Sequence, residues 1–395
     1  MRLILAGKNN IAVDVLDYCL KNLDIPIQVI VNKTETFKNS WQKSFGFHAK
    51  LWNIPVVELN EVYEMEEIIF ISVEFDQLIK PKLFKSKKLY NIHFSLLPKY
   101  KGMYTSAWPI LNNEKETGVT FHEIDAGIDT GDIIEQTKIN INEKDTSRDL
   151  YSKYIKEGTK LVIKNIPNLI SQNIIKKRQS RYNSTWYSLK SINYDNLEIN
   201  YFQTAFQITN QLRAFSFREY QLPKFENNYV NSWEITKNKS FKKPGTIIEK
   251  GNNYALISSI DYDLMIYFDF YNKIWECCKK DNSIELDQIL SNNDINLEIK
   301  TNEGWTALII AVYNGSMNCI KILIEKGADI NASNYNLTSV IMYAKDYTIS
   351  NNYDVIKYLM KFKPNLKHRD IYGKTVLDWS KEQDSNIFKF LKKHL

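Results

Sequence analysis

The chain has 395 residues, of which 44% are hydrophobic and 25% are charged, and its formal net charge at pH 7 is +6. Because this length exceeds that of most single domains, we expect two or three domains with real hydrophobic cores, which excludes a disordered or fibrous protein. No run of eighteen apolar residues occurs, and the segment 1–7 turns polar too quickly for a signal peptide. We therefore expect a cytoplasmic protein without a membrane partner.

The charge pattern and the cysteines narrow the classes of partner. Lysine pairs at 176–177 and 242–243 are expected to be solvated surface, so no nucleic-acid partner is predicted, and an anionic small ligand suits the charge equally well. We expect no metal site and reduced, mostly buried thiols, because neither a zinc-ligand spacing nor a disulfide framework occurs among the four cysteines: Cys19, Cys277, Cys278 and Cys319.

The start of the chain alternates between short apolar runs and helical patterns. Segments 2–7, 26–31 and 67–72 are predicted to be buried parallel strands, with helices over 11–20 and 37–51 between them. This order is typical of βαβ units and predicts a Rossmann-like α/β sheet.

The loop after the first predicted strand lacks the Gly-x-Gly-x-x-Gly pattern, which disfavours dinucleotide binding. Asn9 and Asn10 are predicted to lie at a helix N-terminus, where backbone N–H groups and side-chain amides can hold an anion such as a pyrophosphate. Simple capping of the helix explains the two residues equally well.

Three polar residues form the most informative pattern of the sequence. Asn91 and His93 end a predicted strand, 87–93, and Asp129 lies in a glycine-containing loop after a second predicted strand, 118–124. Ligands bind at the carboxyl ends of strands in open α/β sheets, and the loop can bring Asp129 towards His93. An amide, an imidazole and a carboxylate in this order suit acyl transfer.

The segment 91–102, Asn-Ile-His-Phe-Ser-Leu-Leu-Pro-Lys-Tyr-Lys-Gly, together with Gly118 and the loop 125–132, strongly resembles the folate-dependent formyltransferases. These enzymes formylate methionyl-tRNA, glycinamide ribonucleotide or nucleotide-linked amino sugars. The resemblance implies that 10-formyltetrahydrofolate is the co-substrate and that the three polar residues are catalytic. It also implies that the folate pterin contacts two segments, with the predicted contacts Phe75, Gln77, Leu78, Asp125, Ala126, Gly127 and Ile128.

Each catalytic residue is assigned a role from its chemistry. Asn91 is predicted to donate an N–H to the oxyanion, His93 to take the proton of the amine, and Asp129 to orient the imidazole or hold a bridging water. In a second interpretation, protonated His93 stabilises the oxyanion, and Asp129 with water moves the proton. Ser95 is predicted to cap the strand end or contact substrate, and His122, in mid-strand, is predicted to be a core residue.

The resemblance also favours one class of acceptor. Phe94 stands where the tRNA and purine enzymes usually carry Pro, and the run 91–98 is typical of the sugar enzymes. With the segment 212–217 and a short middle domain, this favours a dTDP-linked amino sugar, specifically dTDP-3-amino-3,6-dideoxyglucose, used for the O-antigen of lipopolysaccharide. A homodimer is expected, as in similar enzymes, and the alternative is an enzyme like methionyl-tRNA formyltransferase.

The middle of the chain is predicted to form a small β domain. A helical pattern over 197–216 precedes two strand patterns, 244–248 and 254–258, which read as a β-hairpin. Arg213 and Tyr220 are predicted to contact the sugar nucleotide, although interface packing explains Tyr220 equally well.

The end of the chain changes in character. The succession 304–332 closely resembles one ankyrin repeat, and degenerate copies flank it. Thr338 follows Thr306 by 32 residues, and Thr375 follows Thr338 by 37, which bracket the expected period of about 33. Trp305 is predicted to face solvent on the recognition surface of the repeat and to form an auxiliary ligand site, for which a nucleotide sugar is the candidate ligand; a protein partner is the alternative.

Three domains are therefore predicted: a catalytic α/β domain over 1–190, a small β-rich domain over 191–268 and an all-α ankyrin-repeat domain over 269–395. The second functional hypothesis is an ankyrin-based binding or regulatory protein with a vestigial enzyme domain.

Overall fold

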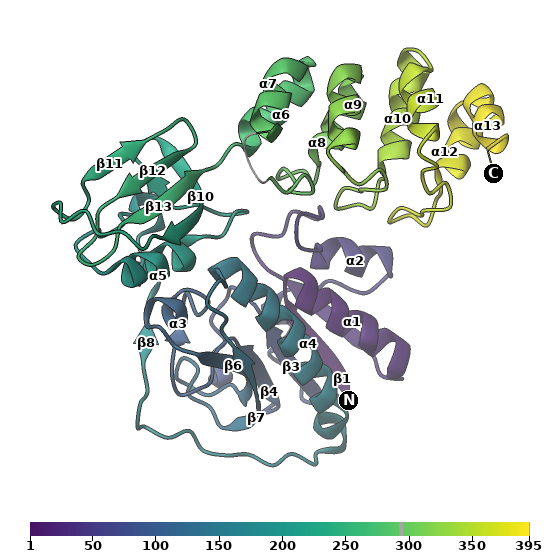
Figure 1. Ribbon diagram of the computed structural model, residues 1–395. Coiled ribbons are helices and arrows are strands. Elements are labelled where there is room, and N and C mark those ends of the chain that lie inside the picture. Colours follow the sequence, from purple (N-terminus) through teal and green to yellow (C-terminus); the bar gives the residue numbers. More distant parts are fainter. Residues whose placement is uncertain (292–294, 395) are drawn as a thin grey trace. The chain divides into compact units, whose positions relative to one another are not determined.

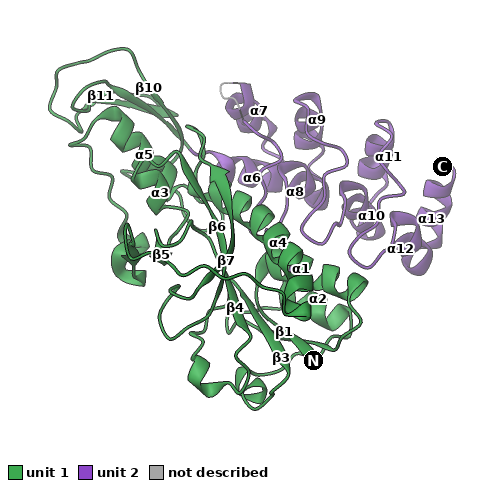
Figure 2. Cartoon of the chain, turned by 90° about the horizontal axis from the view of Figure 1, so that it is seen from below, with its two compact units in different colours: residues 1–38, 43–268 green, residues 39–42, 269–395 purple. Residues whose placement is uncertain are grey.

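The computed structural model describes residues 1–291 and 295–394 (Figure 1). The chain divides into two compact units: unit 1 holds residues 1–38 and 43–268, and unit 2 holds residues 39–42 and 269–395 (Figure 2).

A six-stranded mixed sheet organises the first part of unit 1. Its strand order is β2-β1-β3-β4-β6-β7, and the first four of these strands are parallel, whereas β6 and β7 run antiparallel to their neighbours. This is the predicted Rossmann-like α/β arrangement. The strands are β1 (Arg2–Gly7), β2 (Ile27–Val31), β3 (Ile68–Val73), β4 (Leu89–His93), β6 (Glu116–Glu123) and β7 (Ile133–Asn140).

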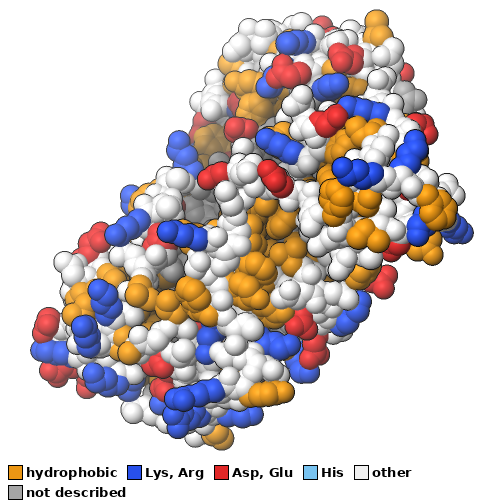
Figure 3. All heavy atoms as spheres, turned by 90° about the vertical axis from the view of Figure 1, so that its left-hand side faces the viewer, with side chains coloured by type: hydrophobic (Ala, Val, Ile, Leu, Met, Phe, Trp, Pro, Cys, Tyr) orange, Lys and Arg blue, Asp and Glu red, His pale blue; other side chains and the backbone are white. Residues whose placement is uncertain are grey.

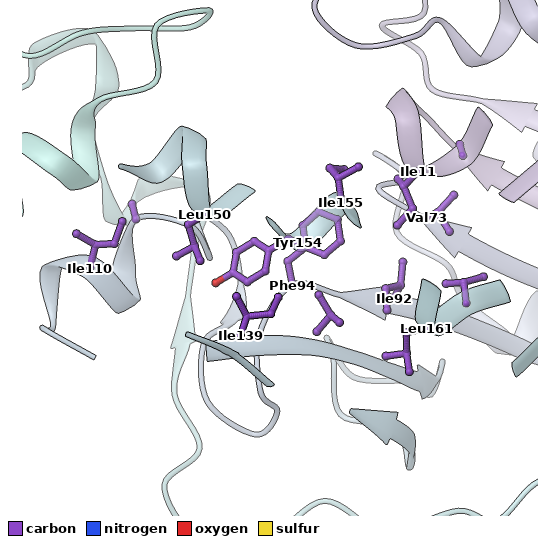
Figure 4. Close-up of a cluster of buried hydrophobic side chains, with 14 of the residues drawn as sticks. Ile11, Val73, Ile92, Phe94, Ile110, Ile139, Leu150, Tyr154, Ile155 and Leu161 are labelled. Atoms are coloured by element: carbon purple, nitrogen blue, oxygen red, sulfur yellow. The ribbon is translucent and has the colours of Figure 1, made fainter. Parts of the chain in front are cut away.

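Two helices, α1 (Asn9–Asn22) and α4 (Ser147–Ser171), contribute to the core on one face of the sheet. The α4 helix begins at Thr146, whose hydroxyl accepts the N–H of Asp149 in a capping box. Side chains from α1, α4 and the strands meet in the buried cluster of Figure 4, where Phe94 stacks on Tyr154 with ring centroids 5.4 Å apart.

A second, smaller core covers the other face. It contains strand residues from β1 to β4 and apolar residues from two short 3₁₀ helices and their flanks: η1 (Leu59–Val62) and η2 (Pro81–Leu83). With both faces covered, the central strands are mostly apolar, as parallel strands usually are, and the polar residues Ser72, Asn91 and His93 stand near their carboxyl ends.

The helix predicted over 37–51 is shorter than expected. Only α2 (Phe45–Leu51) is helical, and it begins where the Ser44 hydroxyl accepts the N–H of Phe47. The Glu35 carboxylate fixes the preceding turn, because it accepts hydrogen bonds from the N–H of Phe37 at 2.7 Å and from the Ser44 hydroxyl at 2.7 Å.

The second half of unit 1 carries a five-stranded antiparallel sheet, with order β11-β12-β13-β10-β9. The predicted helix over 197–216 is α5 (Ala205–Phe215), which begins later because Thr204 caps it. The predicted hairpin is β11 (Ile247–Lys250) and β12 (Tyr254–Ile257), and the sheet is completed by β9 (Lys224–Phe225), β10 (Asn228–Ile235) and β13 (Leu264–Phe268). The remaining short elements are β5 (Lys101–Gly102), α3 (Trp108–Leu111), β8 (Trp186–Tyr187), η3 (Leu189–Ser191) and η4 (Tyr194–Asn196).

Unit 2 consists of successive helix pairs around one core, as ankyrin repeats require. The Thr306 and Thr375 hydroxyls cap the first helices of two repeats. In the repeat between them the residue before the helix is Ser339 rather than the predicted Thr338, which places it 33 residues after Thr306. The helices are α6 (Tyr271–Lys280), α7 (Ser283–Ser291), α8 (Ala307–Asn314), α9 (Met317–Glu325), α10 (Val340–Ser350), α11 (Asp354–Met360), α12 (Val376–Gln383) and α13 (Ser385–Lys392).

The cysteines and the distribution of charged side chains can be compared with what the sequence predicted. All four cysteines are free and buried. Figure 3 shows one face on which Lys and Arg side chains are scattered among acidic and apolar ones. Within the described ranges, 1–291 and 295–394, no helix has the length and apolar character that a membrane span needs.

Candidate active site

The register of three neighbouring strands places the predicted catalytic residues at one edge of the large sheet. Asn91 of β4 lies opposite Ser72 of β3 and opposite His122 of β6, and His93 ends β4 two residues further on. Because side chains alternate along a strand, Asn91 and His93 lie on the same face.

The His93 ring has a close polar neighbour at each nitrogen. Its Nε2 lies 2.8 Å from the carbonyl oxygen of Tyr100, and a carbonyl only accepts hydrogen bonds, so we assign the proton of the neutral ring to Nε2. Its Nδ1 then carries the lone pair and lies 3.4 Å from Oδ2 of Asp129. Only 8% of His93 is exposed, so little water competes for this nitrogen.

Asp129 is fixed by its backbone as well as by its carboxylate. Its φ angle of 54° lies in the left-handed region, and its Oδ2 accepts the N–H of Gly102 at 2.9 Å. The Gln179 amide holds the surrounding loop, since it donates to the carbonyl oxygens of Asp129 and Gly131 at 2.9 and 2.7 Å. Burial alone raises the pKa of the Asp129 carboxyl, but the His93 and His122 rings in their charged forms, together with the Gly102 N–H, hold that pKa well below its usual range.

His122 is buried and hydrogen-bonded, as predicted for a core residue, and it also belongs to this group. Its Nδ1 lies 2.7 Å from the carbonyl oxygen of Glu123, so Nδ1 carries the proton and Nε2 accepts a hydrogen bond from the Asn91 amide at 3.1 Å. A bulge in β7 opposite His122, where the register shifts after Phe121, accompanies this placement.

The contact with His122 fixes the orientation of the Asn91 amide. Only the NH₂ group can donate to Nε2 of His122, so the same nitrogen presents its second hydrogen towards Asp129, whose Oδ1 lies 3.5 Å away. That distance is long for an N–H···O bond, so this hydrogen can turn to a better acceptor.

A cavity of about 140 Å³ opens beside these residues. Asn91, His122 and Asp129 form one part of its wall. Six of the seven residues predicted to contact a pterin lie in the same wall, and they are Phe75, Gln77, Leu78, Asp125, Gly127 and Ile128. The seventh, Ala126, is exposed in the same loop but does not line the cavity.

The predicted contact of Ser95 with substrate is wrong. Ser95 is 0% exposed, and its hydroxyl donates to the carbonyl oxygen of Lys99 at 2.7 Å. Its own carbonyl accepts the Thr120 hydroxyl at 2.6 Å, so Ser95 ties the loop after β4 to β6.

Asn9 and Asn10 lie at the start of α1, and their side chains have different hydrogen-bond partners. The Asn9 amide nitrogen lies 3.2 Å from the Glu74 carboxylate and 2.9 Å from the Tyr151 hydroxyl, so its hydrogens are engaged. The Glu74 carboxylate beside the Asn9 amide would repel an anion, so the structure disfavours the prediction that Asn9 holds a pyrophosphate. The Asn10 side-chain oxygen accepts the N–H of Lys43 at 2.8 Å.

Arg213 and Tyr220, both predicted to contact the nucleotide, differ in accessibility. Arg213 is only 5% exposed, and its guanidinium donates to the carbonyl oxygens of Asp145 and Asn142 at 2.8 and 2.7 Å. Its prediction as a ligand contact is wrong, because it holds α5 against the loop before α4. Tyr220 is 60% exposed and packs its ring on Phe217 with centroids 4.7 Å apart.

Trp305 in unit 2 is not fully exposed, because it packs against two tyrosine rings. Its ring is partly buried, with centroids 4.8 Å from Tyr313 and 5.2 Å from Tyr343, which corrects the predicted solvent-facing position. Tyr313 is the exposed member of this aromatic group, at 50%.

Two segments of the chain, one mainly in unit 1 and one in unit 2, match known families. Residues 22–166 match the family described as formyl transferase, and residues 274–370 match ankyrin repeats in three copies. Methionyl-tRNA formyltransferase of Clostridium beijerinckii is 29% identical over 212 residues, which is 53% of this chain and 68% of that protein.

Two solved structures are more similar. One is WlaRD, a sugar 3N-formyl transferase determined in the presence of dTDP and 5-N-formyl-THF, and the other is an N-formyltransferase from Helicobacter canadensis in complex with folinic acid and dTDP-3-aminofucose. Each is 45% identical, with a TM-score of 0.63 over 68% of this chain. The match covers 97% of the first protein and 99% of the second.

Proposed function

The chain belongs to the folate-dependent sugar N-formyltransferases and carries ankyrin repeats, and from this premise we propose that it transfers a formyl group from 10-formyltetrahydrofolate to the amine of a dTDP-linked 3-amino sugar. The observation that carries the proposal is the meeting of Asn91, His93 and Asp129 at the edge of a cavity lined by the predicted folate contacts. Two relatives at 45% identity that were solved with dTDP or a dTDP-amino sugar and a formyl folate support it.

The contacts of His93 favour its role as the base. In the cation, the Nε2–H would still donate to the Tyr100 carbonyl, and the new Nδ1–H would face the Asp129 carboxylate. Neither hydrogen is then available to an oxyanion. We therefore assign proton acceptance to Nδ1 of His93, with Asp129 stabilising the imidazolium that forms.

The oxyanion is assigned to Asn91. His122 holds one amide hydrogen of Asn91, and the second, now 3.5 Å from Asp129, can turn to the oxygen of the formyl group. The amine nitrogen attacks the formyl carbon, a C–N bond forms, and negative charge moves to that oxygen. When the carbonyl reforms, the bond to the folate nitrogen breaks, and the leaving nitrogen takes up the proton that the amine gave to His93. A single oxyanion donor of this kind is worth about 2.7 to 4 kcal/mol of barrier.

The folate is proposed to occupy the cavity beside Asn91. Exposed apolar side chains, Leu78 at 64% and Ile128 at 44%, line it together with the polar Gln77 and Asp125. Apolar walls with a few polar groups are typical of sites for flat heterocycles.

We also propose a specific acceptor and a biosynthetic role. We favour dTDP-3-amino-3,6-dideoxyglucose and a role in O-antigen synthesis, with a homodimer as the working assembly. The alternative acceptor, methionyl-tRNA, has support in the 29% identity to the Clostridium beijerinckii enzyme, which is lower than the 45% identity to the two sugar enzymes.

A panel assay tests the proposed function. The full chain is incubated with 10-formyltetrahydrofolate and dTDP- or UDP-linked 3-amino and 4-amino sugars, and with methionyl-tRNA, and the release of tetrahydrofolate and the formylated product are measured. We expect turnover with a dTDP-linked 3-amino sugar and its loss in Asn91→Ala. Preferred formylation of methionyl-tRNA would overturn the proposal, and no formylation of any acceptor would favour an ankyrin-based binding protein with a vestigial enzyme domain.

A further inference from the structure

A second polar group lies beside the catalytic residues and has no part in the mechanism above. It consists of Glu74, which follows β3, Asn9 at the start of α1, and Tyr151 in α4. The Tyr151 hydroxyl lies 2.7 and 2.8 Å from the two Glu74 carboxylate oxygens, and the Asn9 amide lies 3.2 Å from one of them. We refer to these three residues as the Glu74 cluster.

The cluster lies at the same sheet edge as the catalytic residues. Val73 lies opposite Ile92 in the parallel pair of β3 and β4, so Glu74 emerges from β3 at the level where His93 ends β4. Neighbouring strands are about 4.8 Å apart, which is within the span of one hexose ring. A sugar whose amine faces His93 therefore presents its neighbouring substituents to the end of β3.

Backbone strain turns the cluster away from the folate cavity. Strand alternation would place Glu74 on the face of Ser72, which lines the cavity. Instead Glu74 has a φ of 57° and contacts α1 and α4, and its partner Asn9 has a φ of 64°. Two residues in the left-handed region, joined by a hydrogen bond at strand ends, are strained features of the kind that gather at binding sites.

The carboxylate keeps the capacity to bind a ligand. Tyr151 and Asn9 bring two donors to a group that accepts about four hydrogen bonds. Glu74 is partly accessible rather than buried. Its local surroundings are nevertheless poorly solvated, because desolvation raises the pKa of its carboxyl above the ordinary value even though Tyr151, Lys8 and Asn9 oppose that effect.

We propose that Glu74, oriented by Tyr151 and Asn9, accepts a hydrogen bond from the sugar hydroxyl next to the reacting amine, and so determines which amino sugars are formylated. This inference rests on the proposed function. A hydroxyl suits the cluster because it is a neutral donor, whereas the diphosphate of the nucleotide would be repelled by the carboxylate.

Phe94 connects the cluster to the catalytic strand. Its ring packs edge-on against Tyr151, with centroids 5.9 Å apart, and stacks on Tyr154 (Figure 4). Phe94 follows His93 directly, so the same residue fixes the Tyr151 ring that orients Glu74. Phe94 acts as a positioning residue for acceptor recognition, because it is 8% exposed and reaches the sugar only through Tyr151.

Deoxy acceptors test the inference. We would measure kcat/KM of the wild type for dTDP-3-amino-3,6-dideoxyglucose and for its 2-deoxy and 4-deoxy analogues, together with Glu74→Gln and Glu74→Met. In the wild type, loss of the recognised hydroxyl should lower kcat/KM by about tenfold to a hundredfold, as expected for a hydrogen bond to a charged group. Glu74→Gln should reduce this discrimination, and Glu74→Met should abolish it.

Tyr151→Phe and Tyr154→Phe separate recognition from packing. Both tyrosines lie on α4 and contact Phe94, but Tyr154 donates to the carbonyl oxygen of Thr105 and not to Glu74. Tyr151→Phe should weaken the discrimination, and Tyr154→Phe should preserve it even where both lower the melting temperature.

Two outcomes would overturn the inference. Discrimination that persists unchanged in Glu74→Met shows that the cluster is structural, while the proposed function stands. A wild type that formylates none of the amino sugars sinks the proposed function and this inference together. The variant series therefore tells the two failures apart.

Discussion

Nδ1 of His93 lies 3.4 Å from Oδ2 of Asp129, while the opposite nitrogen of the same ring is held 2.8 Å from the Tyr100 carbonyl. The ring therefore has one defined way to accept a proton and one defined partner for the charge that results.

Asp129→Asn removes that partner without changing its size. The amide oxygen can still accept the Gly102 N–H, so the loop should keep its shape. The imidazolium loses its carboxylate, and we expect kcat to fall by about 10² to 10⁴-fold at pH 7 with a small change in KM. Steady-state kinetics on the amino-sugar acceptor measure this, and a fall of less than about threefold would contradict the assigned role.

The same substitution should change the pH dependence of stability. The pKa of Asp129 is lowered in the folded protein, so its ionised form stabilises the fold at pH values above the unfolded pKa of about 3.9, and this contribution is lost as the pH falls. Asp129→Asn should therefore reduce the free energy of unfolding at pH 7, and the difference from wild type should shrink only as the pH falls below about 4. Denaturant titrations at several pH values test this; a difference independent of pH would argue against the charge.

His122→Phe tests the orientation of the Asn91 amide. Phe keeps the ring in its 2% exposed site but cannot accept the Asn91 hydrogen that lies 3.1 Å from Nε2. We expect kcat to fall by about tenfold to a hundredfold, because the oxyanion donor is no longer held in place. His48→Phe is the matched control, since His48 is also buried but bonds to the Ser44 carbonyl in α2. Equal kinetic losses in both variants would point to general destabilisation.

Glu74→Gln should separate stability from recognition. Burial raises the pKa of Glu74, so the ionised carboxylate destabilises the fold at neutral pH, and the penalty disappears as the pH falls below the unfolded pKa of about 4.3. The variant should therefore melt at the same or a higher temperature than wild type at pH 7, with no gain near pH 4. Thermal unfolding followed by circular dichroism checks this, and a lower melting temperature at pH 7 would mean that its hydrogen bonds outweigh the cost of burial.

Trp305→Ala addresses the predicted auxiliary ligand site. If the aromatic group of Trp305, Tyr313 and Tyr343 binds a nucleotide sugar, the variant should bind fewer molecules per chain in calorimetry, with unchanged catalytic turnover at saturation. Trp275→Ala is the control, because Trp275 is a partly buried tryptophan of the same unit that packs on Tyr271. Unchanged binding stoichiometry in Trp305→Ala would leave the repeats as a surface for a protein partner.

The fold was predictable where one local signal dominated. The strands β1 and β3 are mainly apolar runs bounded by polar residues, β4 is a short alternating run, and α4 begins at a capping box that the sequence displays at Thr146 and Asp149. The helix expected over 37–51 is confined to Phe45–Leu51, because Phe37 takes a φ of 56° that does not continue a helix and the competing Glu35 carboxylate fixes the turn before α2. Periodicity does not reveal such competition from a side chain.

The site was predictable only within one stretch of chain. Asn91 and His93 stand two residues apart on a strand, so their common face follows from alternation. The part played by His122 depends on the antiparallel pairing of β4 with β6, and that of Glu74 on contacts with residues 9 and 151. Ser95 and Arg213 are buried and donate to backbone carbonyls, so they are not available to a ligand. The residue type alone does not reveal that such a donor is already engaged within the protein.

The backbone of residues 100–102 holds both members of the His93 and Asp129 pair, one through a carbonyl and the other through an N–H. Side-chain replacements at positions 100 and 101 leave those two groups in the chain, so the alignment of the pair can survive sequence drift there. Position 102 is different: its φ is +84°, and a Cβ atom would come within 2.2 Å of the Tyr187 carbonyl oxygen. Evolutionary freedom in this segment should therefore end abruptly at Gly102.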